Sequence, residues 1–349
     1  MLTSKLTRVT SLLVRKSPPV ERTARQGRLL DRAGRFLTRS GVRGVAPAWA
    51  ALAVGLVVMP GCGDMMTEFA ADSTVRVMTR AVKAFDSESD PWLARNSAVS
   101  QLKFAEGVLE ASPENKDLLV LLAKNYSLFA FAFLQDDLDQ VPFGSAEYDT
   151  LRRRAAEFQK RARGYAIRRL KLDFEDADKA VFASGDRFDQ ILAACTAEDH
   201  VGALYFLGYA WSNLIALSPD EPDSLADLPR VRAIMAWVRE KAPEFENGGP
   251  DLFFAQSELL LSKDQGGDKE VAKAAFEKAI AATTGRYLMA KALYARTYLR
   301  AVGDKAGYRQ TLQDVLDADE NIFPEQRLAN TLAKDRAKRW IAQTDKFFE

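Results

Sequence analysis

A cysteine placed directly after an apolar segment has the clearest chemical potential in this chain. Cys62 follows the uncharged, mostly apolar run 45–61, and Arg39 and Arg43 precede that run. A short apolar run with basic residues before it and a small residue at its end is typical of a secretory signal. Cleavage before Cys62 would leave its thiol free to carry diacylglycerol. The pattern predicts lipid attachment at Cys62, whereas an ordinary buried helix or a short membrane anchor is the alternative.

The segment before this run is strongly basic. Residues 1–44 hold eleven Lys or Arg residues but only two acids, a net charge of +9. A charge run with few aromatic residues stays solvated, which favours a disordered leader. The other explanation is a start assigned too early, with translation beginning near Val42, and we favour this second one. In either case the leader takes no part in the fold.

The charge balance of the remaining chain excludes one class of partner. From Cys62 to Glu349 there are 38 basic and 46 acidic residues, a net charge of −8. An acidic chain does not suit the phosphate backbone of DNA or RNA, so no nucleic-acid partner is expected. The 288 residues are enough for a large core.

The side chains needed for catalysis or metal binding are scarce. His200 is the only histidine, which argues against a Ser-His-Asp triad and against a His-based metal site. Asp199 and His200 precede an expected helix and are interpreted as a helix cap. Cys195 lies among apolar residues, so we expect a buried thiol rather than a nucleophile. No Gly-rich phosphate-binding motif is present. The sequence therefore predicts no enzyme, no cofactor and no metal.

One predicted helix is unusually apolar. Between Leu118 and Leu134 few residues are polar, and Tyr126, Phe129 and Phe133 recur on one helical face. A central helix buried by its neighbours is the favoured interpretation. A membrane span of this length interrupted by Lys and Asn is costly. The third interpretation is an apolar ligand cavity lined by the three aromatic residues. Its facing wall is predicted from three residues of a later segment: Tyr205, Tyr209 and Trp211.

Helical periodicity extends over nearly the whole chain after residue 72. Short breaks rich in Gly, Pro, Ser and Asn separate the segments, and short connections favour antiparallel neighbours. The sequence therefore predicts an all-α fold of stacked antiparallel helical hairpins. The expected helices are 73–86, 92–111, 115–135, 146–172, 186–195, 199–217, 228–241, 251–262, 268–282, 286–301, 304–317 and 324–344.

An internal repeat appears near the C-terminus. An offset of 36 residues aligns Asp268 with Asp304 and Phe276 with Leu312. This period is close to that of the tetratricopeptide repeat, whose helical pairs stack into a solenoid with a concave binding surface. The predicted organisation is a leader (1–44), a signal segment (45–61), a tether with the first helix (62–88) and a tetratricopeptide-like α-solenoid (89–349).

Three stretches of this helical region resemble the TatT family, the T-component lipoproteins associated with TRAP-type transporters. The first holds LEASPEN and LLVLLAKNYS (109–127), the second ALYFLGYAW (203–211), and the third PEQRLANTLAK (324–334). The resemblance covers roughly residues 90–349. Two positions depart from the pattern: Phe206 stands where Trp is expected, and the segment before Gly266 lacks a proline.

The resemblance implies a periplasmic, lipid-tethered accessory protein that works beside the solute-binding P-component of the transporter and binds an apolar ligand. The residue after Cys62 is Gly63 rather than Asp, which favours the outer membrane over the inner one. The alternative hypothesis is a scaffold or assembly lipoprotein of the cell envelope with the same solenoid and no ligand. Self-association is left open.

Overall fold

The computed structural model describes residues 62–183, 185–218 and 225–348. The predicted leader and signal segment lie outside these residues. Residues 61–349 make up one compact unit. The helices are α3 (Cys62–Asp86), α4 (Pro91–Ala111), α5 (Lys116–Phe129), η1 (Ala130–Leu134), α6 (Gln135–Leu138), α7 (Ala146–Lys171), α8 (Ala177–Ala180), α9 (Arg187–Ala194), α10 (Ala197–Leu217), α12 (Leu228–Lys241), α13 (Phe245–Leu260), η2 (Lys263–Gln265), α14 (Lys269–Ala282), α15 (Leu288–Leu293), η3 (Tyr294–Leu299), α16 (Lys305–Asp317), η4 (Pro324–Gln326), α17 (Arg327–Ala342) and α18 (Thr344–Phe347).

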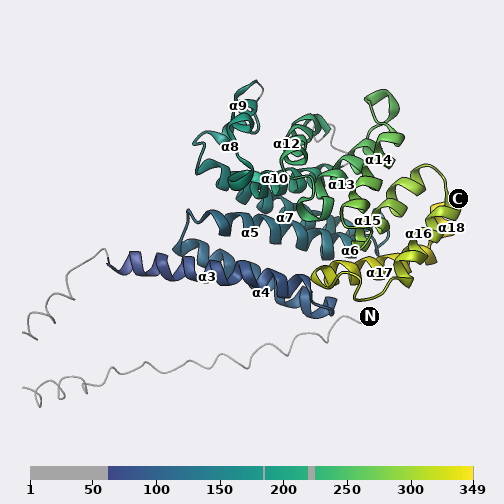
Figure 1. The fold of residues 1–349 in the computed structure, drawn as a ribbon, viewed down its shortest axis with the longest axis horizontal. Helices are drawn as coiled ribbons and strands as arrows, with labels where there is room; N and C mark the ends of the chain where they lie inside the picture. Colours follow the sequence, from purple (N-terminus) through teal and green to yellow (C-terminus); the bar gives the residue numbers. More distant parts are fainter. Residues whose placement is uncertain (1–61, 184, 219–224, 349) are drawn as a thin grey trace, which may run out of the picture. The chain divides into compact units, whose positions relative to one another are not determined.

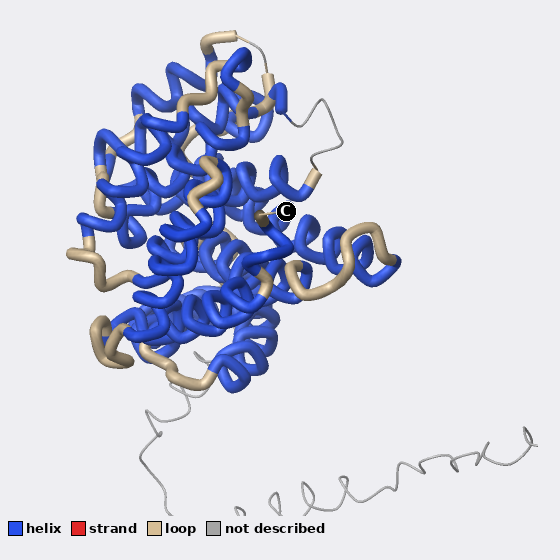
Figure 2. Tube along the Cα trace, turned by 90° about the vertical axis from the view of Figure 1, so that its right-hand side faces the viewer, coloured by secondary structure: helices blue, strands red, loops and turns tan. Residues whose placement is uncertain are grey.

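Neighbouring helices in the sequence are also neighbours in space. Helix α4 contacts α5, α5 contacts α7, α7 contacts α10, and α10 contacts α12. The series continues from α12 to α13 and α14, and then through α15 and η3 to α16 and α17. The described residues contain helices and turns but no strand, as Figure 2 shows. The prediction of an all-α protein is therefore confirmed.

The last long helix returns to the first ones. Figure 1 shows α17, in yellow, beside the purple and blue α3 and α4, and α17 contacts both helices. The stack of helices consequently closes on itself instead of ending as an open array. Side chains from helices far apart in the sequence can meet inside this closed arrangement.

Capping residues account for many of the helix starts. Asp90 accepts hydrogen bonds from the amides of Trp92 and Leu93, and Asn115 accepts one from Leu118. A carboxylate or amide oxygen at this position satisfies backbone donors that have no partner inside the helix. The two aspartates of the predicted repeat, Asp268 and Asp304, each cap a helix in the same way.

The two helices of the repeat bury equivalent positions. In α14 and α16, Phe276 and Leu312 are both fully buried, as are Ala272 and Tyr308. The offset of 36 residues therefore relates two helices with the same cap and the same buried face. Whether the full set of hairpins is a tetratricopeptide solenoid remains a prediction.

The apolar helix is a central element of the fold. Lys116–Leu138 is the one described stretch long and apolar enough to cross a membrane by length and composition, and 61% of its apolar window is buried. It contacts α3, α4, α7 and α10. These neighbours supply the burial that favours a core helix. The structure thus agrees with the favoured interpretation of this segment.

The observed helix bounds differ from the predicted ones at a few places. Helix α3 begins at Cys62 rather than at residue 73, and the short helices α8 and α18 were not predicted. Helix α13 begins before residue 251, but its first turn contains left-handed backbone at Glu246, Asn247 and Gly248. The predicted break at 247–250 therefore corresponds to a real interruption of the helical geometry. One-turn helices escape the periodicity argument because they are shorter than one hydrophobic repeat.

Candidate functional site

The aromatic face of α5 and η1 packs toward α7. Tyr126, Phe129 and Phe133 are all buried. The rings of Tyr126 and Phe129 lie 5.2 and 5.3 Å from the ring of Phe158, and Tyr126 also stacks on Tyr165 at 5.8 Å. Phe133 in turn packs on Phe129 at 5.2 Å, so the three predicted cavity residues belong to one close-packed layer of α5, η1 and α7.

A carboxylate on α4 completes this layer. Glu106 accepts hydrogen bonds from the hydroxyls of Tyr126 (2.5 Å) and Tyr165 (2.9 Å) and also from Lys103. Burial acts to raise the pKa of Glu106, but the hydrogen bonds outweigh this effect and lower it. The Glu106 carboxylate and the two tyrosine hydroxyls thus hold α4, α5 and α7 together through hydrogen bonds.

Tyr205 and Tyr209 of α10 lie together on another face. Their rings stack at 5.8 Å. Tyr205 contacts Phe245 at 5.1 Å, and Tyr209 contacts Phe131 of η1 at 6.3 Å. The aromatic residue of the apolar helix that meets Tyr209 is therefore Phe131, rather than a member of the predicted stripe.

Trp211 points elsewhere. Its ring lies 5.3 Å from that of Phe182 and 5.2 Å from the guanidinium carbon of Arg163. Its indole nitrogen donates a hydrogen bond of 3.0 Å to Asp227. The six aromatic residues predicted from the sequence thus fall into three separate environments: the stripe of α5 and η1, the pair Tyr205 and Tyr209, and Trp211 alone.

An ion pair lies near the tyrosine pair. Lys124 of α5 binds Glu246 of α13, with 2.7 Å between Nζ and Oε1, and the two side chains keep 19% and 22% of their surface exposed. Burial raises the pKa of the neighbouring Asp86 to about 6, although Lys124 opposes the shift. Burial also acts against the charged form of Lys124, but Glu246 and Asp86 outweigh it and raise its pKa. The Lys124 ammonium is therefore paired with Glu246, and its charge also acts on the Asp86 carboxyl.

Three tyrosines surround these charges. Burial raises the pKa of Tyr205, Tyr209 and Tyr287, and Glu246 adds to the effect on each of them. Arg336 of α17 opposes it at Tyr209 and Tyr287. These phenols are consequently neutral. We call the following residues the central cluster: Asp86, Lys124, Tyr205, Tyr209, Glu246, Tyr287 and Arg336. Nearly every one comes from a different helix or helix start.

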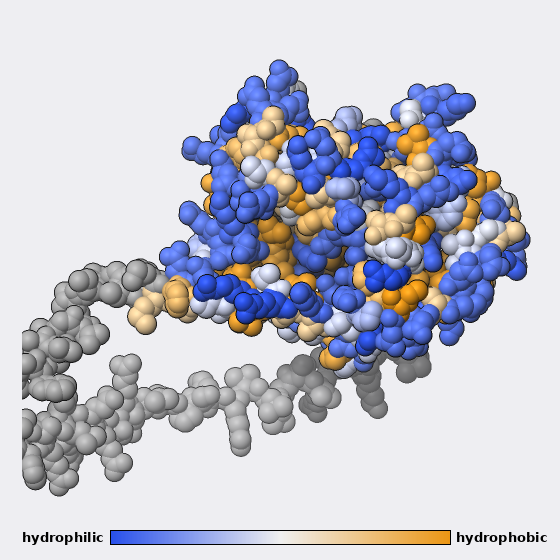
Figure 3. Space-filling view, in the orientation of Figure 1, coloured by the Kyte–Doolittle hydropathy of each residue, from blue (hydrophilic) through white to orange (hydrophobic). Residues whose placement is uncertain are grey.

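Two tyrosines of the central cluster are only partly buried. Tyr209 and Tyr287 keep an intermediate share of their surface accessible, whereas Tyr205 is buried. Figure 3 shows hydrophobic residues in a hollow above α3 and α4, with polar residues around them.

Strained backbone positions one carboxylate of the cluster. Glu246 and Asn247 have φ values of 48° and 62°, and Gly248 follows at 80°. Non-glycine residues in this left-handed region cost about 1–2 kcal/mol each. Close packing accompanies the turn, because a Cβ on Gly249 would lie 2.1 Å from the hydroxyl oxygen of Tyr205. Such strain persists where surrounding contacts enforce it and is common at functional sites.

The return of α17 completes the cluster. Arg336 donates from Nε to Asp136 at 2.8 Å and from Nη2 to the carbonyl of Phe131 at 2.7 Å, and its guanidinium lies over the Phe131 ring. Phe131 belongs to η1, a π-helix. A π-helical turn displaces backbone carbonyls from the regular hydrogen-bonding pattern, so they can accept from a side chain. Trp340 adds a hydrogen bond to Asp139.

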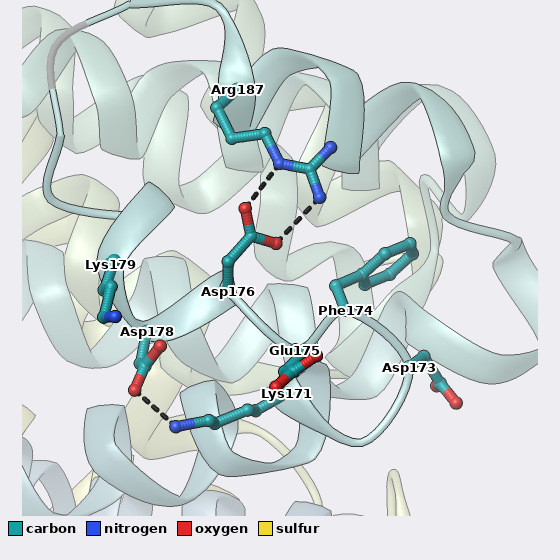
Figure 4. Close-up of a pocket in the computed structure, with 8 residues that line it drawn as sticks. All are labelled: Lys171, Asp173, Phe174, Glu175, Asp176, Asp178, Lys179 and Arg187. Carbon is teal, nitrogen blue, oxygen red and sulfur yellow. Dashed lines mark hydrogen bonds and ion pairs between the residues drawn. The ribbon is translucent and has the colours of Figure 1, made fainter.

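A depression on the surface carries charges that are already paired. Figure 4 shows Arg187 bound to Asp176 and Lys171 bound to Asp178 around it. Both pairs lie at the exposed surface, where such contacts contribute little. These two pairs use four of the charged side chains around the depression, so we place the candidate site at the central cluster instead.

The two residues with reactive side chains are structural. Burial raises the pKa of the Cys195 thiol to about 11, which keeps it protonated. His200 accepts a hydrogen bond at Nδ1 from the amide of Thr196, the N-cap of α10, and its Nε2 lies 3.2 Å from Asp173. Within the described residues, no cluster of His, Cys, Asp or Glu could hold a metal ion.

The geometry defines a class of protein: closed all-α, with an aromatic and polar interior and no reactive set of side chains in the described region. A family model described as TRAP transporter T-component matches residues 87–348. The chain belongs to this family, as the resemblance implied. It is also similar to an uncharacterized protein of Treponema pallidum (strain Nichols), with 26% identity over 275 residues, which cover 76% of this chain and 83% of that protein.

Membership of this family gives the general role of the protein. The protein is a T-component associated with a TRAP transport system and with the cell envelope, and the family acts as a transporter accessory rather than as a known enzyme. Sequence reasoning missed five residues in and beside the central cluster: Asp86, Phe131, Glu246, Tyr287 and Arg336. Four of them stand alone in separate segments, and Phe131 lies on a different face of its helix from the predicted stripe.

Proposed function

We propose that this T-component is a lipid-anchored protein of the periplasm that binds the solute-binding P-component and an apolar ligand. The partial exposure of Tyr209 and Tyr287 within the aromatic central cluster carries the proposal. Binding sites for small molecules are concave, largely apolar, and supplied with a few polar groups that orient the ligand. The central cluster has this composition, with tyrosine rings as walls and the Lys124–Glu246 pair as polar end.

The anchor is Cys62, in a chain whose apolar run 45–61 serves as the signal. With Gly63 after the cysteine, we propose the periplasmic leaflet of the outer membrane as its place. Metabolic labelling with a fatty acid tests the anchor: the wild-type chain should be labelled and Cys62→Ala should not. Equal labelling of the two would refute lipid attachment, and recovery only in inner-membrane fractions would refute the outer-membrane placement.

For the ligand, we narrow the predicted cavity to the part near Tyr205 and Tyr209. The test uses residues 62–349, which lie within a single compact unit, and the apolar fluorophore diphenylhexatriene as probe. Tyr209→Ala should change probe binding strongly while most of the stability is kept. Phe129→Ala, in the close-packed layer, is the control and should lower stability without changing probe binding. If Phe129→Ala changes probe binding and Tyr209→Ala does not, the ligand cavity lies at the predicted stripe of Tyr126, Phe129 and Phe133 instead.

For the partner, we propose that the hairpins form a tetratricopeptide-like solenoid whose surface binds the P-component. The matching caps and buried faces of α14 and α16 support this interpretation. Co-purification with the full-length chain as bait is the test. Recovery of a solute-binding protein supports the proposal. The alternative, an envelope scaffold without ligand, predicts recovery of assembly proteins and no effect of Tyr209→Ala on probe binding.

A further inference from the structure

The first helix exposes an unusual amount of apolar surface. Met66, Phe69 and Val77 of α3 are exposed at 71%, 69% and 67%. Positions three and eleven residues apart lie on one side of a helix. Ala70, Ala81 and Ala84 are exposed on the same side. The opposite side packs into the fold through residues that include Ala71 and Val75. Helix α3 therefore has two apolar faces, one packed into the fold and the other exposed.

The same region dominates the exposed apolar surface of the protein. The described residues carry twelve large apolar side chains that are exposed, and seven of them lie between Met66 and Phe104. Four of the seven belong to α4, which packs against α3. A concentration of exposed apolar side chains on two neighbouring helices favours an interaction site, whereas scattered single residues do not.

Charge along the outer face of α3 points to the nature of the partner. The exposed charged side chains after Glu68 are Arg76, Arg80 and Lys83, all of them basic. An apolar stripe edged with Lys and Arg is typical of helices that lie in the interface of a membrane with anionic lipids.

The position of the predicted anchor at Cys62 also favours a membrane surface as the partner of α3. Helix α3 begins at Cys62 itself, so no flexible linker separates the lipid from the helix. A helix rises 1.5 Å per residue, which places Met66 within about 6 Å and Val77 within about 23 Å of Cys62 along the axis. Figure 1 shows the first turns of α3 protruding beyond the other helices. The lipid would hold this outer face at the membrane surface.

We infer that α3 lies on the anionic lipid surface in which Cys62 is anchored, with Met66, Phe69 and Val77 inserted among the headgroups. The inference rests on the proposed lipid attachment and adds a second contact to it. A helix with an apolar face and basic residues adds its own binding to a membrane beside the lipid chains. The arrangement also fixes the orientation of the central cluster relative to the membrane, because α3 packs directly on α4, α5 and α17.

The test uses the full-length chain, purified as the lipoprotein and reconstituted into vesicles of phosphatidylethanolamine and phosphatidylglycerol. A fluorophore is attached at Val77→Cys, or at Val271→Cys on the exposed face of α14 as the matched control. Cys195 stays unlabelled because burial raises the pKa of its thiol. With brominated lipids, the label at residue 77 should lose most of its fluorescence, and the label at residue 271 should keep it.

A second pair of variants tests the charges. Arg76→Glu with Arg80→Glu should reduce quenching at residue 77, and Arg153→Glu with Arg154→Glu on α7 should leave it unchanged. The controls match, since Arg76 and Arg153 each hydrogen-bond a hydroxyl one turn away. If the labels at residues 77 and 271 are quenched equally, the inference about α3 is wrong. The lipid anchor itself would still stand if the chain is labelled with fatty acid. Shielding of residue 77 in lipid-free oligomers overturns it in favour of a second copy. Absence of fatty-acid labelling overturns the anchor and the inference together.

Discussion

Arg336 hydrogen-bonds Asp136 across 200 residues of sequence, with 2.8 Å between Nε and Oδ1. Its guanidinium also binds the carbonyl of Phe131. The contact joins the last long helix to the π-helical end of the apolar helix, and only 5% of the arginine is exposed. A buried guanidinium is tolerated only with such partners, because an unpaired buried charge is strongly destabilising.

Arg336→Ala is expected to lower the free energy of unfolding by about 3 kcal/mol. The Phe131 carbonyl would lose its charged donor, and Asp136 would retain Arg339 as its one cationic partner, with Gln140 as a neutral donor. Urea unfolding measures the loss. Arg309→Ala is the control: its partner Asp345 is exposed, so the cost should stay below about 1 kcal/mol. Similar losses for both variants would contradict the role given to Arg336.

Phe129→Ala is expected to cost about 3–5 kcal/mol of stability, the usual loss for a buried phenylalanine. Phe129 is 6% exposed and stacks on Phe158. Phe143→Ala is the matched control, because Phe143 is an exposed ring outside the core, and it should change stability by about 0.5 kcal/mol or less. A small loss for Phe129→Ala would show that the ring borders free space.

Periodicity and breaker residues predicted the helices well, and the structure explains why. Apolar spacing and capping residues such as Asp90 and Asn115 act locally, so they can be recognised in a single segment. The candidate site depends instead on distant pairings such as Lys124 with Glu246. Neither residue has a neighbour in sequence that marks it. The aromatic stripe was recognised correctly as one face, but its partner, Phe158 on α7, could not be known before the fold.

Asp86→Asn is expected to change how stability depends on pH. Burial raises the pKa of Asp86 from 3.8 to about 6, so the folded chain holds this proton more tightly than the unfolded chain. The unfolding free energy contributed by this carboxyl therefore falls as pH rises from about 4 through about 6, by something on the order of 2–3 kcal/mol. Relative to wild type, the variant should gain stability across that window. Urea titrations at a series of pH values measure the difference.

The control for this experiment is Asp345→Asn. A hydrogen bond from Lys305, together with the charges of Lys305 and Arg309, lowers the pKa of this exposed carboxyl. Its stabilising contribution is present above the unfolded pKa and is lost as pH falls through the lowered one. The difference from wild type should therefore have the opposite sign of slope. A flat difference for Asp86→Asn would contradict the burial of that carboxyl.

Two glycine substitutions should have opposite effects. Gly249→Ala places a Cβ 2.1 Å from the hydroxyl oxygen of Tyr205, inside the core, and should cost about 1–3 kcal/mol. Gly107→Ala, in the open middle of α4, meets nothing within 4 Å and should stabilise by about 0.5–1 kcal/mol. Thermal unfolding of both variants tests the pair. Adding Tyr205→Phe should recover part of the loss at Gly249 if the hydroxyl is the obstacle.

The return of α17 to α3 and α4 has a consequence for how the chain acquires its structure. Contacts between segments some 200 residues apart form only after the intervening chain has been ordered or looped, and non-local contacts of this kind slow folding. A nascent chain that lacks α17 would leave the apolar helix and the end of α3 incompletely covered. Such an intermediate exposes aggregation-prone surface until α17 has been synthesised and packed. The chain is therefore prone to misassembly during folding until this helix is in place.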